Sequence, residues 1–367
     1  MITDLLTAIA VVLNGIPQGI LALSFGFAAF PTSIAFLVGI LGSLAFNSVA
    51  TISFQAETIT LAGTMGNDIR ERLSLVFWGA VFLLIPSLLG LNEAIVQFIG
   101  PVIVTSMMAG VGIMLAYVSV DLLRSERYSG LVSMVTALAV WFVTKDLAKT
   151  IIISVILSTI AYNFLKRYPT LVKDEPVADL ANERFHFGNI EWKFWTNRRV
   201  LLGALALACL NIGANISFGK ITGSIAGVET NIDHLAIYSS LADIGSTLFG
   251  GSPVEAIISG TATAPRPLLS SVLMMGIMAA ILLFKLLPTI GRFVHRSSIA
   301  GFLFILGTFV TFATNIQGAL AMAPEFPGPF GFSPWGMVIG ATVLVSAKWN
   351  PFYGLVAGLA IKVVFGL

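Results

Sequence analysis

The sequence predicts an all-α membrane protein that crosses the bilayer many times. Of its 367 residues, 57% are hydrophobic and only 10% are charged, whereas soluble domains carry about 25% charged residues. Apolar runs of about 20 residues, the length that spans a bilayer as a helix, recur along nearly the whole chain. The sequence lacks the short alternating segments of a transmembrane β-barrel. We therefore expect a multi-pass protein of the cell (inner or plasma) membrane.

Fourteen membrane elements are expected in order along the chain. Twelve are apolar stretches, and they cover residues 5–30, 34–54, 73–91, 95–123, 131–145, 147–165, 200–219, 234–249, 268–287, 297–314, 333–347 and 350–366. The other two, residues 55–66 and 252–264, are interrupted by glycine, proline and hydroxyl residues. Unpaired backbone at membrane depth is tolerated only inside protein or beside a wet cavity. Each interrupted segment is therefore predicted to be a short extended piece followed by a half-helix, forming broken spans 3 and 10.

The elements divide into two repeats of seven, residues 1–165 and 200–367, joined by a polar linker at 166–199. Short identities recur at a spacing of 197 residues: Leu13-Asn14 with Leu210-Asn211, Ser43–Ala45 with Ser240–Ala242, and Gly63-Thr64 with Gly260-Thr261. Seven is an odd number, so the second repeat must cross the membrane in the opposite direction, which makes an inverted repeat. Aromatic residues in the linker predict that it lies at the membrane interface.

The segment around Glu255 is the strongest candidate for a site. The run Gly250–Pro253 breaks an apolar stretch, and the carboxylate follows at once. An ionisable residue inside the membrane is costly and indicates function. The same pattern at residues 54–64 contains Glu57. Two interrupted segments at corresponding places in two halves predict the binding site of a secondary transporter.

The candidate substrate-binding residues lie beside the two breaks or on the helices expected to face them. They are Glu255, Asn211, Ser259, Gly260, Glu57, Thr58, Phe54 and Asn14. Amides supply both a donor and an acceptor. Hydroxyl and free N–H groups at a half-helix N-terminus form a donor nest, and Phe54 offers a flat stacking face. For each polar residue the structural alternative is a hydrogen bond between helices.

Three carboxyl groups are candidates for proton coupling: Asp243, Glu255 and Glu57. Burial disfavours the ionised form of a carboxyl group, so such a group can hold a proton. The alternatives are a solvated position at the membrane boundary for the glutamates and a simple interhelical hydrogen bond for Asp243.

Several functions have no residue support. Cys209 is the only cysteine, and no Cys/His cluster is present to hold a metal. Nucleotide-binding and protease motifs are missing as well. A net charge of +2, scattered along the chain, favours no nucleic-acid partner. We expect neither an enzyme nor a cofactor.

The sequence resembles the nucleobase–cation symporter-2 family, the uracil, xanthine and purine permeases. The resemblance covers most of the chain, and its most specific part is the block Ser240–Gly245, Phe249–Pro253 and a half-helix at Val254–Thr263. A weaker likeness to the purine branch runs from Gly90 to Ile113. The resemblance implies a mobile core domain and a gate domain, each assembled from both repeats, with the substrate site between broken spans 3 and 10. It also implies proton-coupled uptake by a homodimer.

The sequence departs from the family at two acids. Leu210 and Ser259 stand where the family carries acidic residues on spans 8 and 10. Glu255 precedes Ser259 by one helical turn if that segment is helical, and it is expected to substitute. Asp243 matches an acid or amide of the family's span 9. The basic loops predict extracytoplasmic termini, whereas the resemblance implies cytoplasmic ones.

The main hypothesis is a proton-coupled secondary transporter of a nucleobase or similar planar heterocycle, working by alternating access of core against gate. The alternative is a transporter of anions such as sulfate, bicarbonate or a carboxylate. The family of sulfate and bicarbonate transporters shares the fold and uses donor nests without the two acids of spans 8 and 10. A non-transporting scaffold or a membrane enzyme is a third hypothesis. The expected partners are a small-molecule substrate, protons or another coupling ion, the lipid bilayer and a second copy of the chain.

Overall fold

The protein is a multi-pass membrane protein built almost entirely of helices. The computed structural model describes residues 1–167, 183–324 and 333–367. Within these ranges, seven helices are long and apolar enough to cross a membrane. They are α1 (Ile2–Ser24), α4 (Ile69–Leu88), α6 (Pro101–Ser125), α7 (Arg127–Thr144), α8 (Leu147–Leu165), α9 (Arg198–Ala226) and the continuous run Arg296–Met322. The predicted all-α membrane architecture is confirmed.

The remaining elements complete two series in the same order. In the first half they are α2 (Ala29–Ala45), β1 (Ile52–Ser53), α3 (Ala56–Met65) and α5 (Asn92–Ile99). In the second half they are α10 (Ile232–Leu248), β2 (Glu255–Ala256), η3 (Gly260–Thr263), α11 (Pro267–Leu283), α12 (Leu286–Gly291), α15 (Pro334–Lys348) and α16 (Pro351–Val364). The run Arg296–Met322 comprises η4 (Arg296–Ile299), α13 (Ala300–Ile305), the π-helical η5 (Leu306–Phe312) and α14 (Ala313–Met322).

Short helices divide one of the predicted spans and join the main groups of helices. The predicted stretch 95–123 is split between α5 and α6 at Gly100, which has φ +98° and precedes a proline. Pro101 then begins α6, where its fixed φ suits the first helical position. The linker adds one 3₁₀ turn, η2 (Phe194–Thr196).

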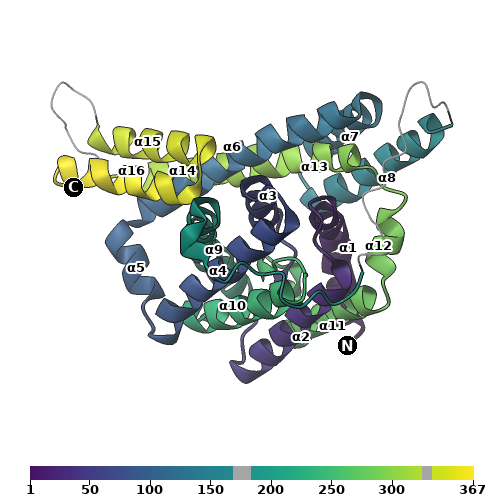
Figure 1. The fold of residues 1–367 in the computed structure, drawn as a ribbon, viewed down its shortest axis with the longest axis horizontal. Coiled ribbons are helices and arrows are strands. Elements are labelled where there is room, and N and C mark those ends of the chain that lie inside the picture. The colour runs from purple at the N-terminus through teal and green to yellow at the C-terminus, as the bar shows by residue number, and fades with distance from the viewer. Residues whose placement is uncertain (168–182, 325–332) are drawn as a thin grey trace.

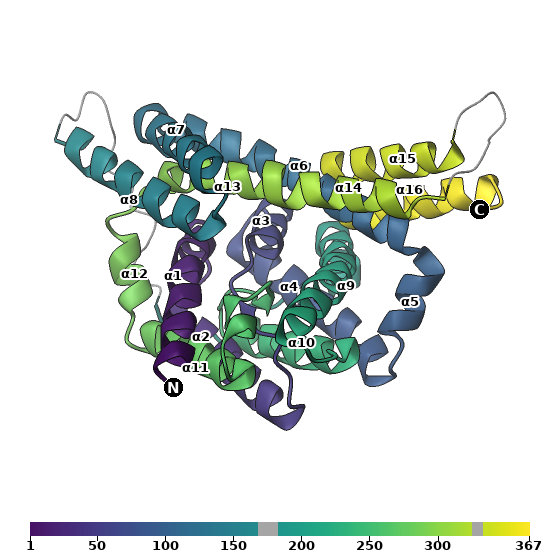
Figure 2. The same cartoon turned by 180° about the vertical axis from the view of Figure 1, so that it is seen from behind.

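The helices form two groups that lie one above the other in Figures 1 and 2. We call α1–α4 and α9–α11, with the strands and η3, the broken-span group, and it occupies the lower part of both views. The transverse layer above it contains α6–α8, the run Arg296–Met322, α15 and α16. Helices α5 and α12 connect the groups on opposite sides. Each group draws on both halves of the chain.

The two broken spans meet through their extended pieces. Strands β1 and β2 pair antiparallel, with Ile52 opposite Ala256 and Ser53 opposite Glu255. After β1 the chain turns into α3, the predicted half-helix. The second span differs, because β2 is followed by a single 3₁₀ turn and not by a helix over Val254–Thr263. Ser259 caps this 3₁₀ turn, because its side-chain hydroxyl accepts a hydrogen bond from Thr261 N. Helical structure therefore begins only after Ser259.

The strand pairing also corrects the repeat register. Helices α2 and α10 end at Ala45 and Leu248, and strands β1 and β2 begin at Ile52 and Glu255. Both pairs of positions differ from the spacing of 197 residues, which would place Ser43 on Ser240. The short identities in apolar sequence therefore do not give the register of the elements around the broken spans.

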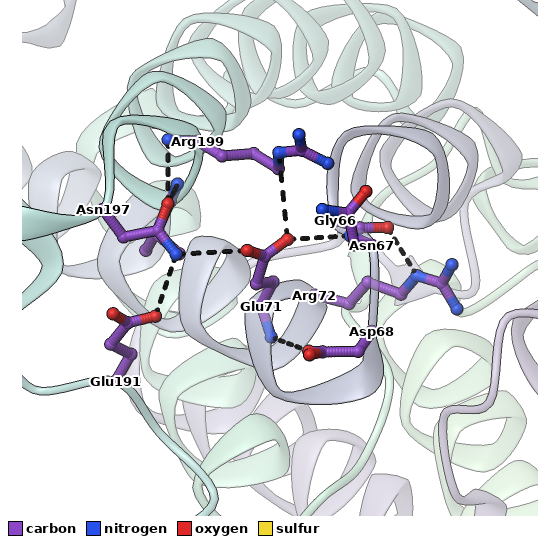
Figure 3. A network of polar contacts seen from close by, with 9 residues as sticks. Gly66, Asn67, Asp68, Glu71, Arg72, Glu191, Asn197 and Arg199 are labelled. Carbon is purple, nitrogen blue, oxygen red and sulfur yellow. Dashed lines mark hydrogen bonds and ion pairs between the residues drawn. The ribbon is translucent and has the colours of Figure 1, made fainter.

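The described end of the linker is fastened to α4 and α9 by a polar network, shown in Figure 3. Glu71 is its centre: its carboxylate accepts hydrogen bonds from Asn67 N (2.8 Å) and from Asn197 Nδ2 (3.1 Å). Asn197 Nδ2 also donates to Glu191 Oε2 (3.1 Å), and Arg199 Nε lies 3.9 Å from Glu71 Oε2. This part of the predicted linker therefore adheres to the broken-span group. Residues 168–182 lie outside the described ranges.

Glu183 caps a helix from a distance in sequence. Helix α2 has Ala28 at its N-cap and no side-chain cap of its own. The Glu183 carboxylate accepts hydrogen bonds from Ala29 N (3.0 Å) and Phe30 N (2.7 Å). Burial raises the pKa of this carboxyl, although the two N–H groups and the Lys285 charge favour its ionised form.

We expect this pKa shift to show as a pH-dependent stability difference between the wild type and Glu183→Gln. A raised pKa in the folded state means that the contribution of Glu183 is full below the unfolded value of about 4.5 and is lost as pH rises through the folded value. The melting temperature of the wild type should therefore fall relative to the variant as pH increases from 4. An opposite trend in thermal unfolding curves would mean that the N–H groups outweigh burial.

Close helix packing in the transverse layer depends on Gly112. A Cβ atom there would lie 2.5 Å from Phe312 N and 2.6 Å from Gly307 O, both backbone atoms of η5. Backbone cannot yield as a flexible side chain does, so Gly112→Ala is expected to destabilise the protein by about 1–3 kcal/mol. Gly340 in α15 has open space around it, and Gly340→Ala is the control. Thermal unfolding in detergent compares the two, and equal melting temperatures would contradict the packing argument.

Candidate functional site

The turn after α10 brings two acidic residues together. Gly250, at φ +94°, reverses the chain, and Gly251 N donates to Ser246 O (2.8 Å). A Cβ at Gly251 would lie 2.3 Å from Ser246 Oγ, so only glycine fits. The chain then runs back along α10 until Val254 N donates to Asp243 Oδ1 (2.7 Å). This return places Glu255, the next residue, beside Asp243.

Asp243 and Glu255 form a buried pair of carboxyl groups. Each side chain is 1% exposed, and the two carboxyl groups lie close enough to interact electrostatically. Asp243 Oδ2 and Glu255 Oε2 have no donor among the described residues, and no described Lys or Arg pairs with either group. Two neighbouring carboxylates repel each other when both are ionised, so a proton on one of them stabilises the pair.

A chain of polar side chains extends from this pair to the first broken span. Asn211 Nδ2 donates to Glu255 Oε1, and Ser239 lies near the same carboxyl. The hydroxyl of Thr58, in the first turn of α3, lies 3.2 Å from Asn211 Oδ1 and also within hydrogen-bonding distance of Gln55 Oε1. The hydroxyl has one proton, so it can donate to only one of these partners at a time. The network therefore has two alternative arrangements.

Glu57 points away from that network, towards the transverse layer. Its side chain is 4% exposed, and its Oε1 accepts a hydrogen bond of 2.9 Å from Thr311 Oγ1. Thr311 belongs to the π-helical η5, and single π-helical turns occur frequently at functional sites. This bond joins a broken span of one group to the middle of a helix in the other.

Ser259 and Gly260 are separated from Glu255. Glu255 lies in β2, which ends at Ala256, and Ser259 has an extended backbone before η3, so no helical turn connects Glu255 to Ser259. Ser259 instead belongs to a hydroxyl cluster: its Oγ lies 2.6 Å from Thr261 Oγ1, which lies 3.0 Å from Thr51 Oγ1. The expectation that Glu255 replaces an acid at Ser259 from one turn away does not hold.

The remaining two candidates make no described contact with the acid pair. Phe54 is 1% exposed, and its ring packs edge-on against Phe36 with centroids 5.5 Å apart. Asn14 lies on α1, and its Oδ1 has no hydrogen-bond partner among the described residues.

Sequence reasoning missed Ser239, Gln55 and Thr311 as members of the site. Gln55 could have been predicted from the sequence, because it is an amide located at the first break. Ser239 and Thr311 carried none, because single hydroxyl residues are common in membrane helices and usually bond to their own backbone.

The fold is that of a known class of membrane transporter. The structure is similar to the transmembrane domain of a cyanobacterial bicarbonate transporter, BicA, with a TM-score of 0.67 and 16% sequence identity over 97% of both chains. It is also similar to SLC26A9, with a TM-score of 0.71 and 14% identity over all of this chain and 65% of that one. The murine Slc26a9 anion transporter in its inward-facing state gives 0.72 and 14%, over 99% and 68%.

At these identities the similarity establishes the fold alone, and the chain spans about two thirds of the SLC26A9 chains. No family model matches the sequence, and no curated protein matches it either. The predicted resemblance is thus supported at the level of the shared fold. The three neighbours are transporters and not enzymes, and their names point to bicarbonate or other anions and not to nucleobases.

Proposed function

We propose that this protein is a secondary transporter that moves a small anion together with a proton, and that Asp243 and Glu255 hold the proton. The observation that carries the proposal is the buried carboxyl pair at the junction of the two broken spans. Substrate sites in inverted-repeat transporters lie at such junctions. The structural neighbours support an anion as the substrate over the heterocycle that the sequence resemblance implies.

Charge balance explains why an anion would require the proton. Two unit charges 4 Å apart interact by about 4 kcal/mol at the effective dielectric constant of a protein surface. An anion beside an ionised acid pair is therefore repelled, and a proton on the pair removes that repulsion. Because coupling between two binding sites is reciprocal, the anion would in turn strengthen proton binding.

Helix α3 would supply attraction for the anion. Its N-terminus begins at Ala56, and Gln55 Nε2 lies 3.5 Å from Ala256 O, so the helix starts beside β2. The positive end of a half-helix dipole favours negative charge. Thr58 would donate its hydroxyl to the substrate in one of its two arrangements.

Movement of the broken-span group against the transverse layer would alternate access to this site. The Glu57–Thr311 hydrogen bond crosses between the groups, so it must break and re-form if they move past each other. The broken-span group would then be the core and the transverse layer the gate. Coupling to another ion and assembly as a homodimer stay predictions.

A second candidate substrate is a planar heterocycle such as a nucleobase. Asn211, Gln55 and the acid pair present amide and carboxyl edges within one network. Such edges match the C=O and N–H groups of a base. A heterocycle without net charge would not be repelled by the Asp243–Glu255 pair, so its binding would not require a proton there.

A thermal-shift screen at pH 6 and pH 8 tests both candidates on purified protein. A ligand that binds only the folded state raises the melting temperature by mass action. We expect sulfate or a small carboxylate to stabilise the protein, with the larger shift at pH 6. Stabilisation by a purine or pyrimidine alone would select the second candidate. An anion effect that is equal at both pH values would refute the role of the acid pair.

A further inference from the structure

Helices α1, α8 and α12 lie near one another at one side of the molecule, where the broken-span group meets the transverse layer (Figure 2). Residues of these helices and of the segment after α12 line an apolar groove. Its volume is about 380 Å³, and its walls are aliphatic and aromatic apart from Thr159 and Thr289. Ile160 on one rim and Phe293 on another are 60% and 61% exposed. Exposed apolar side chains of this kind favour contact with lipid over contact with water.

One end of the groove carries a cluster of positive charge. Asn163 Nδ2, near the end of α8, donates to Phe293 O (2.8 Å), and the rings of Tyr162 and His295 stack with centroids 4.7 Å apart. These contacts bring the C-terminal end of α8, with Arg167, next to the segment that holds Arg292 and Arg296. All three arginines are exposed, and none forms an ion pair with a described residue.

An unpaired hydroxyl lies between the apolar part and the basic end. Thr159 is one of the lining residues, and its Oγ1 is buried without a hydrogen-bond partner among the described residues. It precedes Asn163 by one turn of α8. The groove lining is therefore apolar apart from its two threonines, and the arginines lie on the segments that adjoin it.

We propose that this groove binds an anionic phospholipid, with an acyl chain along α1 and α8, an ester group at Thr159 and the phosphate at Arg292 and Arg296. The order of apolar chain, ester and phosphate in such a lipid matches the order from the apolar lining, through Thr159, to the arginines beside the groove. Arginine binds phosphate oxygens through two parallel N–H bonds, and basic residues at the membrane surface attract anionic lipids. The inference does not depend on the proposed substrate.

The site has a consequence for transport, because its walls come from both helix groups. A lipid that binds the groove more tightly in this arrangement of the two helix groups than in another would stabilise this arrangement. The stabilisation would equal the difference between the two binding free energies.

Lipid binding to the full-length protein in detergent tests the assignment, with phosphatidylglycerol and phosphatidylcholine as probes. Retained lipid is measured by native mass spectrometry, and the melting temperature follows the stabilisation. We expect the wild type to retain phosphatidylglycerol in preference to phosphatidylcholine. The double variant Arg292→Gln/Arg296→Gln should bind phosphatidylglycerol at least about tenfold more weakly, because two charged contacts are lost.

Two further variants separate the headgroup from the groove. Arg70→Gln/Arg198→Gln removes two exposed charges elsewhere and should retain phosphatidylglycerol like the wild type. Ile156→Trp, at a lining residue that is 53% exposed, should fill the groove and reduce retention of both lipids. It also keeps the test informative if the arginine variant does not fold.

Three results would overturn the proposal. The first is equal retention of phosphatidylglycerol by the wild type, the arginine variant and Ile156→Trp. The second is an equal loss in the control variant, which would indicate a non-specific charge effect. The third is an equal stabilisation by inorganic phosphate or glycerol phosphate, which would mean that the acyl chain and the groove play no part.

Discussion

Replacing Glu255 with glutamine is expected to abolish the dependence of anion uptake on a pH gradient while leaving the fold intact. Glutamine keeps an oxygen that can accept the bond from Asn211 Nδ2, but it cannot share a titrating proton with Asp243. The pair then loses one of its two acids, and its proton no longer moves with the substrate. Uptake into proteoliposomes, driven by an inward proton gradient, should fall at least about tenfold, since disturbing a buried polar network costs about 1–3 kcal/mol.

The matched variants are Asp243→Asn and Glu93→Gln. Asparagine at position 243 keeps the oxygen that accepts from Val254 N, so it should reproduce the loss of pH dependence without unfolding the turn. Glu93 is an exposed acid that pairs with Lys220 and not with Asp243 or Glu255. Its replacement should therefore leave uptake unchanged. Full pH-dependent uptake in both Glu255→Gln and Asp243→Asn would show that the pair carries no proton.

Replacing Thr311 with valine is expected to reduce transport while preserving substrate binding. Valine has the shape of threonine but no hydroxyl, so the buried Glu57 carboxylate loses its described side-chain donor. A buried acceptor left unsatisfied costs about 1–3 kcal/mol, and more when charged. That cost falls only on the arrangement in which the two residues meet. The variant should therefore favour other arrangements of the two helix groups and slow uptake by about tenfold or more.

Thr311→Ser provides the control, because serine keeps the hydroxyl and loses only a methyl group. The measurement compares uptake in proteoliposomes with ligand-induced shifts in melting temperature. Wild-type uptake in Thr311→Ser and reduced uptake in Thr311→Val, with similar ligand shifts, would support the role of this bond in movement. Normal uptake in the valine variant would refute it.

The general architecture was accessible from sequence because it depends on local properties. Apolar runs gave the spans, and the glycine–proline break at Gly250–Pro253 gave the second interrupted segment. The half-helix Ala56–Met65 and the extended chain at Glu255–Ala256 lie within the two predicted interrupted segments, whereas the extended chain at Ile52–Ser53 lies inside the stretch 34–54 that was predicted as a span. These features need no knowledge of which residues meet across the fold.

Features that depend on contacts between distant segments were not accessible. The pairing of β1 with β2 makes Glu255–Ala256 extended, so Ser259 does not lie one helical turn from Glu255. The turn at Gly251 decides that Asp243 and Glu255 meet, although each was recognised separately as a candidate. Thr311 lies 254 residues from Glu57 in the sequence, and nothing in the local pattern connects them.

Proton flux measured together with anion uptake tests the central claim most directly. Proteoliposomes that contain a pH-sensitive dye, given the anion identified by the thermal-shift screen, would report both quantities at once. We predict that addition of the anion acidifies the interior in the wild type, with proton entry proportional to anion entry, and that Glu255→Gln shows no proton entry. Anion uptake without internal acidification in the wild type would contradict proton coupling at the Asp243–Glu255 pair.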